Sequence, residues 1–304
     1  MPKCQYFSKS YFFFKNNFKF IIFNGKGGNG KGVINDLFLT GLGFYGFQGN
    51  NSILFEKNRT GSNPEKSNLH RKRYVVFREP AEKNKIENSV VKELTGGGTF
   101  SSRSHYEKDT EKELNLTMIV ECNKRPLFTE EPTDGDIRRI IDIFFRSKFV
   151  TDIDDVNEQN YVYLANIEYK TKEFTNKYKY ALLKILFETH SIYYKNNSIL
   201  KLPESIIIRT NAYLEMSCEI LQWFKENYEE NNKTIIYLKD IYEYFITDSE
   251  YYSNLTKNEK KKFNKIYFIE YFQTNAFLKN FYLSRKNNIR HCVQGWIIKS
   301  TKDF

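Results

Sequence analysis

Cysteine and proline are scarce in this chain of 304 residues, which contains 4 cysteines and 6 prolines. The cysteines form no Cys-x-x-Cys pair and have no flanking histidine cluster, so neither a zinc site nor a disulfide framework is expected; they stand at Cys4, Cys122, Cys218 and Cys292. An intracellular, reducing compartment fits this usage best. Few prolines and an apolar content of 40% argue against general disorder.

Long apolar runs are also lacking. The most aromatic stretch, residues 11–23, is interrupted by Lys15, Asn16, Asn17 and Lys19. No segment therefore predicts a membrane span, and the ordered layout of a signal peptide is missing as well. We expect a protein without a membrane partner.

Glycine is absent between Gly135 and Gly295, and this shift in composition marks a boundary near residue 150. Before it, short apolar runs alternate with loops and a helical pattern, which predicts an α/β domain with strands at 20–23, 74–77, 116–122 and 140–145 and a helix at 33–42. After it, the pattern is mostly helical, with helices at 211–228, 235–246 and 257–272. Two strands at 281–283 and 292–298 then give the end of the chain a winged-helix-like order.

The net charge of +10 has two explanations. Lys, Asn, Ile, Tyr and Phe are all specified by AT-rich codons, so coding bias can account for much of it. The distribution is more informative, because residues 1–150 carry 25 basic and 17 acidic side chains and residues 151–304 carry 22 and 20. An anionic partner would require an excess of positive charge in the first half.

A glycine-rich loop follows the first predicted strand. Gly25, Gly30 and Lys31 have the G-x-x-x-x-G-K spacing of a phosphate-binding loop, in the sequence Gly25-Lys26-Gly27-Gly28-Asn29-Gly30-Lys31-Gly32. Its backbone N–H groups and the amino end of the following helix would bind phosphate oxygens. A glycine turn without nucleotide is the alternative. Gly32 stands where a hydroxyl normally contacts magnesium.

Further polar residues follow the later strands. Glu79 ends the run 74–78, where a carboxylate could polarise water and help to hold hydrated magnesium, although a solvated edge glutamate is the simpler interpretation. Asn123 ends the run 116–122 and is suited to orienting a water. Arg138 and Arg139 precede the fourth strand, and such a pair is more often merely solvated.

These elements together resemble the superfamily 3 helicases, and among them the poxvirus-type primase–helicases of nucleocytoplasmic large DNA viruses. The similarity rests on GKGGNGKG (25–32), REP (78–80), KELTGGGTFSSR (92–103), IVECNKRP (119–126) and IRRI (137–140). It implies a P-loop NTPase domain of AAA+-like fold at 19–150, after an irregular segment at 1–18. A helical connecting region at 151–229 and a winged-helix-like module at 230–304 would follow.

The resemblance also implies roles. Lys31 matches the Walker A lysine, Glu79 the Walker B acid that holds Mg²⁺ through water, and Asn123 the sensor asparagine, with ATP as the nucleotide. Arg138 or Arg139 would be an arginine finger acting on a neighbouring subunit, which implies a homo-hexameric ring. Contacts to single-stranded DNA are expected from Lys92, Arg103, Lys108 and Lys112. The family more often has Asp where this chain has Gly98.

The family further implies a collar domain and a primase before the ATPase, which residues 1–18 cannot contain. We therefore expect these parts upstream or on another chain. Two rival functions stay open, a DNA-binding remnant that has lost hydrolysis and a P-loop motor of the DNA-packaging type.

Overall fold

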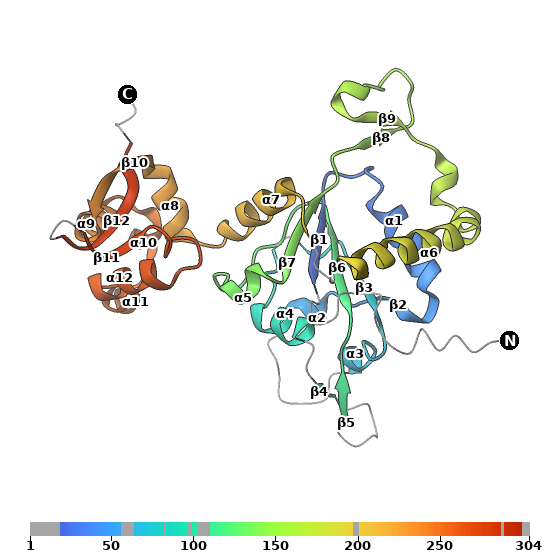
Figure 1. Ribbon diagram of the computed structural model, residues 1–304, viewed down its shortest axis with the longest axis horizontal. Coiled ribbons are helices and arrows are strands. Elements are labelled where there is room, and N and C mark those ends of the chain that lie inside the picture. Colours follow the sequence, from blue (N-terminus) through green and yellow to red (C-terminus); the bar gives the residue numbers. More distant parts are fainter. Residues whose placement is uncertain are drawn as a thin grey trace. The chain divides into compact units, whose positions relative to one another are not determined.

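The structure is a computed structural model that describes residues 19–55, 64–81, 83–96, 99–102, 110–196, 201–286 and 289–299 (Figure 1). The chain divides into two compact units. The first contains the residues up to Glu130 and Gly135–Tyr213, and the second contains Glu131–Asp134 and the chain from Leu214 onward. The first unit thus extends beyond residue 150. The predicted irregular segment 1–18 lies outside the described residues.

The first unit is built on a sheet of five parallel strands in the order β2-β3-β6-β1-β7 (Figure 1). The strands are β1 (Phe20–Asn24), β2 (Gly46–Gln48), β3 (Tyr74–Arg78), β6 (Thr117–Cys122) and β7 (Ile140–Phe144). The four predicted strands are confirmed, because apolar runs of this length are typical of parallel strands buried on both faces. The prediction missed β2, which has only three residues.

Helix α1 (Lys31–Leu42) packs on one face of this sheet, beside the long helix α6 (Lys172–Lys195) (Figure 1). Phe38 stacks on Tyr74 with ring centroids 4.8 Å apart, and Leu183 of α6 joins the same apolar cluster. The unit also contains η2 (Gly43–Tyr45), α2 (Ser52–Phe55), α3 (Pro64–Ser67), α4 (Asn88–Thr95), β4 (Thr99–Ser102), β5 (Thr110–Glu113), β8 (Lys148–Val150), η3 (Glu158–Asn160), β9 (Val162–Leu164) and η4 (Ile167–Lys170). Helix α5 (Asp134–Ile137) precedes β7, and α7 (Glu204–Glu215) follows α6.

The second unit has a three-stranded antiparallel sheet in the order β10-β12-β11 and a core of aromatic side chains. Its elements are α8 (Glu219–Asn227), β10 (Tyr228–Tyr237), α9 (Leu238–Asp248), α10 (Glu250–Asn254), α11 (Lys257–Lys262), α12 (Lys265–Thr274), β11 (Tyr282–Lys286) and β12 (Ile289–Ile298). The two predicted strands are confirmed. Three helix predictions need correction. A break at 216–218 divides the predicted helix 211–228, a break at 263–264 divides 257–272, and 235–237 belong to β10.

Across the part of the chain that the structure describes, no helix combines the length and the apolar character that crossing a membrane requires.

Candidate functional site

The predicted site residues lie where three neighbouring parallel strands end. The phosphate loop follows β1, Glu79 follows β3, and Asn123 follows β6, which pairs with both of these strands. The end of β6 therefore lies between the ends of β1 and β3. Ligands of open parallel sheets bind at this carboxyl edge, so the topology gathers the three predicted elements at one place.

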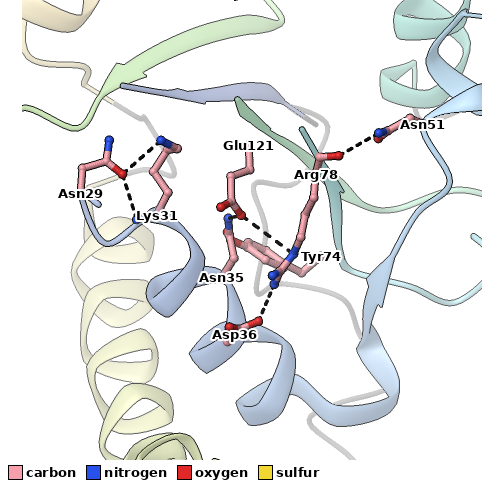
Figure 2. Close-up of polar contacts among 8 residues, drawn as sticks. All are labelled: Asn29, Lys31, Asn35, Asp36, Asn51, Tyr74, Arg78 and Glu121. Atoms are coloured by element: carbon pink, nitrogen blue, oxygen red, sulfur yellow. Dashed lines mark hydrogen bonds and ion pairs between the residues drawn. The ribbon is translucent and has the colours of Figure 1, made fainter. Parts of the chain in front are cut away.

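Lys31 begins α1, and its ammonium group is turned back into the loop (Figure 2). The Nζ atom donates to the carbonyl oxygen of Gly25 at 2.6 Å, to Oδ1 of Asn29 at 3.1 Å and to Oδ1 of Asn123 at 3.3 Å. Lys31 as a whole is only 3% exposed. The structure thus brings the predicted Walker A lysine into direct contact with the predicted sensor asparagine.

The loop reaches this shape through backbone conformations that favour glycine. Gly25 has φ of 145°, and a Cβ there would lie 2.4 Å from Nδ2 of Asn29 and 2.7 Å from the carbonyl oxygen of Phe145. Gly30 precedes the helix in the left-handed region with φ of 86°. The backbone N–H of Phe149 donates to the carbonyl oxygen of Gly28 at 2.7 Å, so the segment after β7 holds the loop from outside.

Two opposing effects act on the charge of Lys31. Burial lowers the pKa of its ammonium group, while the carboxylates of Glu79 and Glu121 act in the opposite direction. Within the described residues, no carboxylate forms an ion pair with Nζ, whose acceptors are neutral amide and carbonyl oxygens. The positive charge is therefore held in place by dipoles and stays available to an anion.

Glu79 is exposed and has φ of 43°, the left-handed region that non-glycine residues rarely adopt. Its backbone N–H donates to the carbonyl oxygen of Glu121 at 2.7 Å, which ties the end of β3 to β6. Its carboxylate contributes to the raised pKa of the Cys122 thiol, about 12, for which burial is the larger cause. Strained residues of this kind cluster at functional sites.

Glu121 has no predicted role, but it lies on the strand between the phosphate loop and Glu79 and borders Gly32. It lies on β6, is 8% exposed, and accepts a hydrogen bond at Oε2 from Nδ2 of Asn35 at 2.8 Å (Figure 2). Asn35 is fully buried and its Oδ1 accepts from the hydroxyl of Tyr74 at 2.7 Å. The available signal was an acid inside an apolar strand, two residues before Asn123 and so on the same side of the strand.

A second buried carboxylate, that of Asp142 on β7, contacts the last residue of β1, which precedes the phosphate loop. It is fully buried and accepts hydrogen bonds from the side-chain amide of Asn24 and from the Arg125 guanidinium, the latter at 3.0 Å. Its backbone N–H donates to the hydroxyl of Thr210 on α7 at 3.0 Å. Burial raises the pKa of this carboxyl, and Arg125 acts in the opposite direction.

Arg138 and Arg139 lie at the other edge of the sheet. The carbonyl oxygen of Arg139 accepts from the backbone N–H of Phe20, where β1 begins, and Lys19 Nζ donates to the carbonyl oxygen of Arg138 at 2.5 Å. The five residues of β1 separate this edge from the phosphate loop, roughly 13 Å at the usual rise per residue. The structure therefore does not bring either arginine to the phosphate loop of its own chain.

The predicted DNA contacts are described only in part. Lys92 on α4 forms an ion pair with Asp136, with Nζ 3.3 Å from Oδ2. Lys112 lies in β5, and its backbone pairs with Phe100 of β4. Arg103, Lys108 and Gly98 lie outside the described residues.

The donor set at the carboxyl edge suits a hydrated magnesium ion and not a protein-enclosed one. Among the residues that the structure describes, no group of three or more His, Cys, Asp or Glu side chains could hold a metal. The carboxylate of Glu121 borders Gly32, the amide oxygen of Asn123 contacts Lys31, and Glu79 follows the neighbouring strand β3. Mg²⁺ keeps several waters and binds through one or two carboxylates and nucleotide phosphates, so these residues fit.

Comparisons with known proteins place the chain near one viral protein. Over 233 residues, 74% of its length, it is 25% identical to "Putative helicase L207/L206" of Acanthamoeba polyphaga mimivirus. The alignment covers 24% of that protein, so the chain spans about a quarter of the curated relative's length. No protein-family model matches the chain.

Solved structures give a weaker likeness. The A-form apo structure of the NrS-1 C-terminal region covers 95% of this chain and 68% of its own, at 14% identity and a TM-score of 0.43. A second A-form apo structure of that region, residues 305–718, gives 16% identity and a TM-score of 0.44, with coverage of 96% and 68%. Both scores lie below 0.5 and assign no fold family.

Proposed function

We propose that this chain is the ATPase part of an ATP-dependent DNA helicase of the superfamily 3, poxvirus-type class, acting in viral DNA replication. The observation that carries the proposal is the contact between Lys31 Nζ and both the loop carbonyl of Gly25 and the amide of Asn123. It joins two separately predicted motifs at the carboxyl edge of a parallel sheet. The name of the mimivirus relative agrees with this proposal.

The chemistry follows from what each side chain can do at that edge. Backbone N–H groups of the loop and the Lys31 ammonium neutralise the phosphate oxygens on which negative charge develops during transfer. Glu79, exposed at the end of β3, accepts a proton from the attacking water or orients it, and Asn123 fixes the position of that water. A bound Mg²⁺ supplies further neutralisation of the β and γ phosphates.

Assembly completes the site in this proposal. Arg138 or Arg139, at the far edge of the sheet, acts on nucleotide bound by the next subunit of a homo-hexamer. Loss of such a finger typically lowers the hydrolysis rate by roughly 10³–10⁵-fold. Collar and primase parts come from another segment or another chain.

The DNA contacts belong to the same proposal. Single-stranded DNA passes through the ring. Its phosphate backbone is contacted there by Lys92, Arg103, Lys108 and Lys112. Such binding depends on salt and little on sequence. In this proposal, residues 230–304 of the second unit form a winged-helix-like domain. Its helices are followed by the β11–β12 hairpin.

The test is ATP hydrolysis with and without single-stranded DNA, for the wild-type chain and for Lys31→Ala. We expect stimulation by DNA in the wild type and a loss of about 10²–10³-fold in Lys31→Ala, because one preorganised charge contact to the transition state is removed. Lys279→Ala is the matched control, since that lysine pairs with Asp134 in the second unit.

The outcomes separate the rivals. A wild-type chain that binds DNA but hydrolyses no ATP would contradict the helicase proposal and favour the hydrolysis-deficient remnant, which Gly32 also suggests. Hydrolysis without strand displacement, in a protein assembled with its collar part, would favour a packaging-type motor.

A further inference from the structure

The phosphate loop lacks a side chain at the position after its lysine. Gly32 is the second residue of α1, and no hydroxyl is available there. The nearest atom to the place where a Cβ would stand is Oε1 of Glu121, at 3.4 Å. The space next to Gly32 thus borders a carboxylate from a different strand.

Glu121 is held so that one oxygen is anchored and the other is free. Oε2 accepts from Asn35 at 2.8 Å and lies 3.9 Å from Nε of Arg78, which itself pairs with Asp36 (Figure 2). Among the described residues, no donor contacts Oε1. The Glu121 side chain is 11% exposed, so Oε1 borders the start of α1 without a protein donor and within reach of a bound ligand.

We infer that Glu121 takes over the magnesium-holding role for which Gly32 has no side chain. Oε1 binds the ion or one of its waters when Mg²⁺–nucleotide occupies the loop, and Asn35 and Arg78 fix the carboxylate in that direction. A serine or threonine at position 32 would put its Cβ and hydroxyl next to Oε1, so a glycine there leaves this space to the carboxylate. The inference rests on the proposed nucleotide binding.

The experiment measures binding of N-methylanthraniloyl-ATP to the full chain by fluorescence, in MgCl₂ and in EDTA. The readout is the dissociation constant in EDTA divided by the dissociation constant in MgCl₂. This ratio can be measured without hydrolysis. For Glu121→Gln we expect this ratio to fall by about 10–100-fold, the usual loss when a metal-supporting group is removed. Binding in EDTA stays equal or becomes tighter, because a negative charge near the phosphates is gone.

Asp36→Asn is the matched control. Asp36 lies on α1, the helix of Gly32, and pairs with Arg78, so this substitution also removes one negative charge near the site. The Asp36 side chain does not border Gly32. We expect its Mg²⁺ ratio to equal that of the wild type. The double variant Gly32→Ser with Glu121→Gln should regain part of the lost ratio, because the serine hydroxyl returns an oxygen to the same space.

Each possible result supports or overturns the inference. An unchanged ratio in Glu121→Gln overturns the inference and leaves Glu121 as an anchor between α1 and β3, while nucleotide binding stands. A wild-type chain that binds no nucleotide, or Lys31→Ala binding as tightly as wild type, overturns the proposed function and the inference with it. If Glu121→Gln does not fold, Glu121→Asp replaces it; the withdrawn carboxylate should lower the ratio while binding in EDTA is kept.

Discussion

The two units of this chain are stabilised by different chemistry. In the first unit, polar side chains are buried beside the sheet and hold one another, as Asn35 holds Glu121 and Asn24 holds Asp142. In the second unit, aromatic rings fill the core. The ring of Phe224, for example, lies against those of Tyr228, Phe272 and Trp296. Buried polar networks specify positions closely, whereas aromatic packing supplies stability through area.

The candidate site lies in the unit with the buried polar network. A buried polar group without a partner is costly, so buried pairs such as Asn35–Glu121 and Asn24–Asp142 mark places where the first unit has a defined polar arrangement instead of apolar packing. In the described part of the second unit, the half-buried Glu131 accepts from the Tyr271 hydroxyl at 2.6 Å and from Asn275 at 3.2 Å. Burial raises the pKa of Glu131, and the hydrogen bonds from Tyr271 and Asn275 act in the opposite direction.

The largest effect should come from the aromatic core. Phe224→Ala removes a fully buried ring, and we expect the second unit to lose about 3–5 kcal/mol of unfolding free energy. Both tryptophans of the chain, Trp223 and Trp296, lie in this unit, so urea unfolding followed by tryptophan fluorescence reports on it selectively. Nucleotide binding should persist.

Phe44→Ala is the control for this change, because Phe44 is 68% exposed in the first unit. Its effect should stay within about 0.5 kcal/mol, as for most surface substitutions. A fluorescence midpoint that does not move in Phe224→Ala would show that the second unit does not depend on its aromatic packing.

A smaller effect is expected within the phosphate loop. Gly25→Ala combines a φ of 145° with a Cβ that has no room, so we expect about 1–3 kcal/mol of destabilisation and weaker nucleotide binding. Gly27 has no atom within 4 Å of its Cβ position, and Gly27→Ala should leave stability within about 0.5 kcal/mol. Thermal unfolding followed by circular dichroism measures both, and equal effects would contradict the loop geometry.

The smallest effect concerns the strained backbone at Glu79. Asparagine tolerates the left-handed region better, so Glu79→Asn should stabilise the first unit by about 0.5–1 kcal/mol while ATP hydrolysis is lost. Arg71, exposed at φ of 62°, is a control outside the site, and Arg71→Asn should give the same gain with hydrolysis intact. Unchanged stability in Glu79→Asn together with a gain in Arg71→Asn would show that Glu79 is not strained.

Four of the five strands in the main sheet of the first unit were predictable because their apolar runs are continuous, whereas the short β2 was missed. In the second unit, the sequence pattern did not predict β10. The polar residues Glu229, Glu230, Asn231 and Asn232 interrupt any strand pattern, and the register shifts before Ile235. Two helix breaks were missed as well. Asn264 accepts from the backbone N–H of Tyr267 and starts α12, a cap hidden inside an apparently continuous helical period.

The site was predictable to the extent that it follows strand ends. Lys31, Glu79 and Asn123 each come directly after an apolar run, and parallel pairing brings such ends together. Glu121 and Asp142 lie inside their strands, so their partners Asn35 and Arg125 become evident only from the register of the sheet and the packing of α1. The position of Glu121, an acid inside an apolar strand two residues before Asn123, was a signal in the chain, but its hydrogen-bond partner was not predictable from the sequence.

Asp142 has one further consequence, for the kinetics of folding. Its contacts to Asn24, Arg125 and Thr210 span 118, 17 and 68 residues of sequence. Contacts that close long loops tend to form late, after the transition state, and groups that act late influence unfolding rates more than folding rates. Asp142 should therefore govern how long the folded sheet persists and not how quickly it forms.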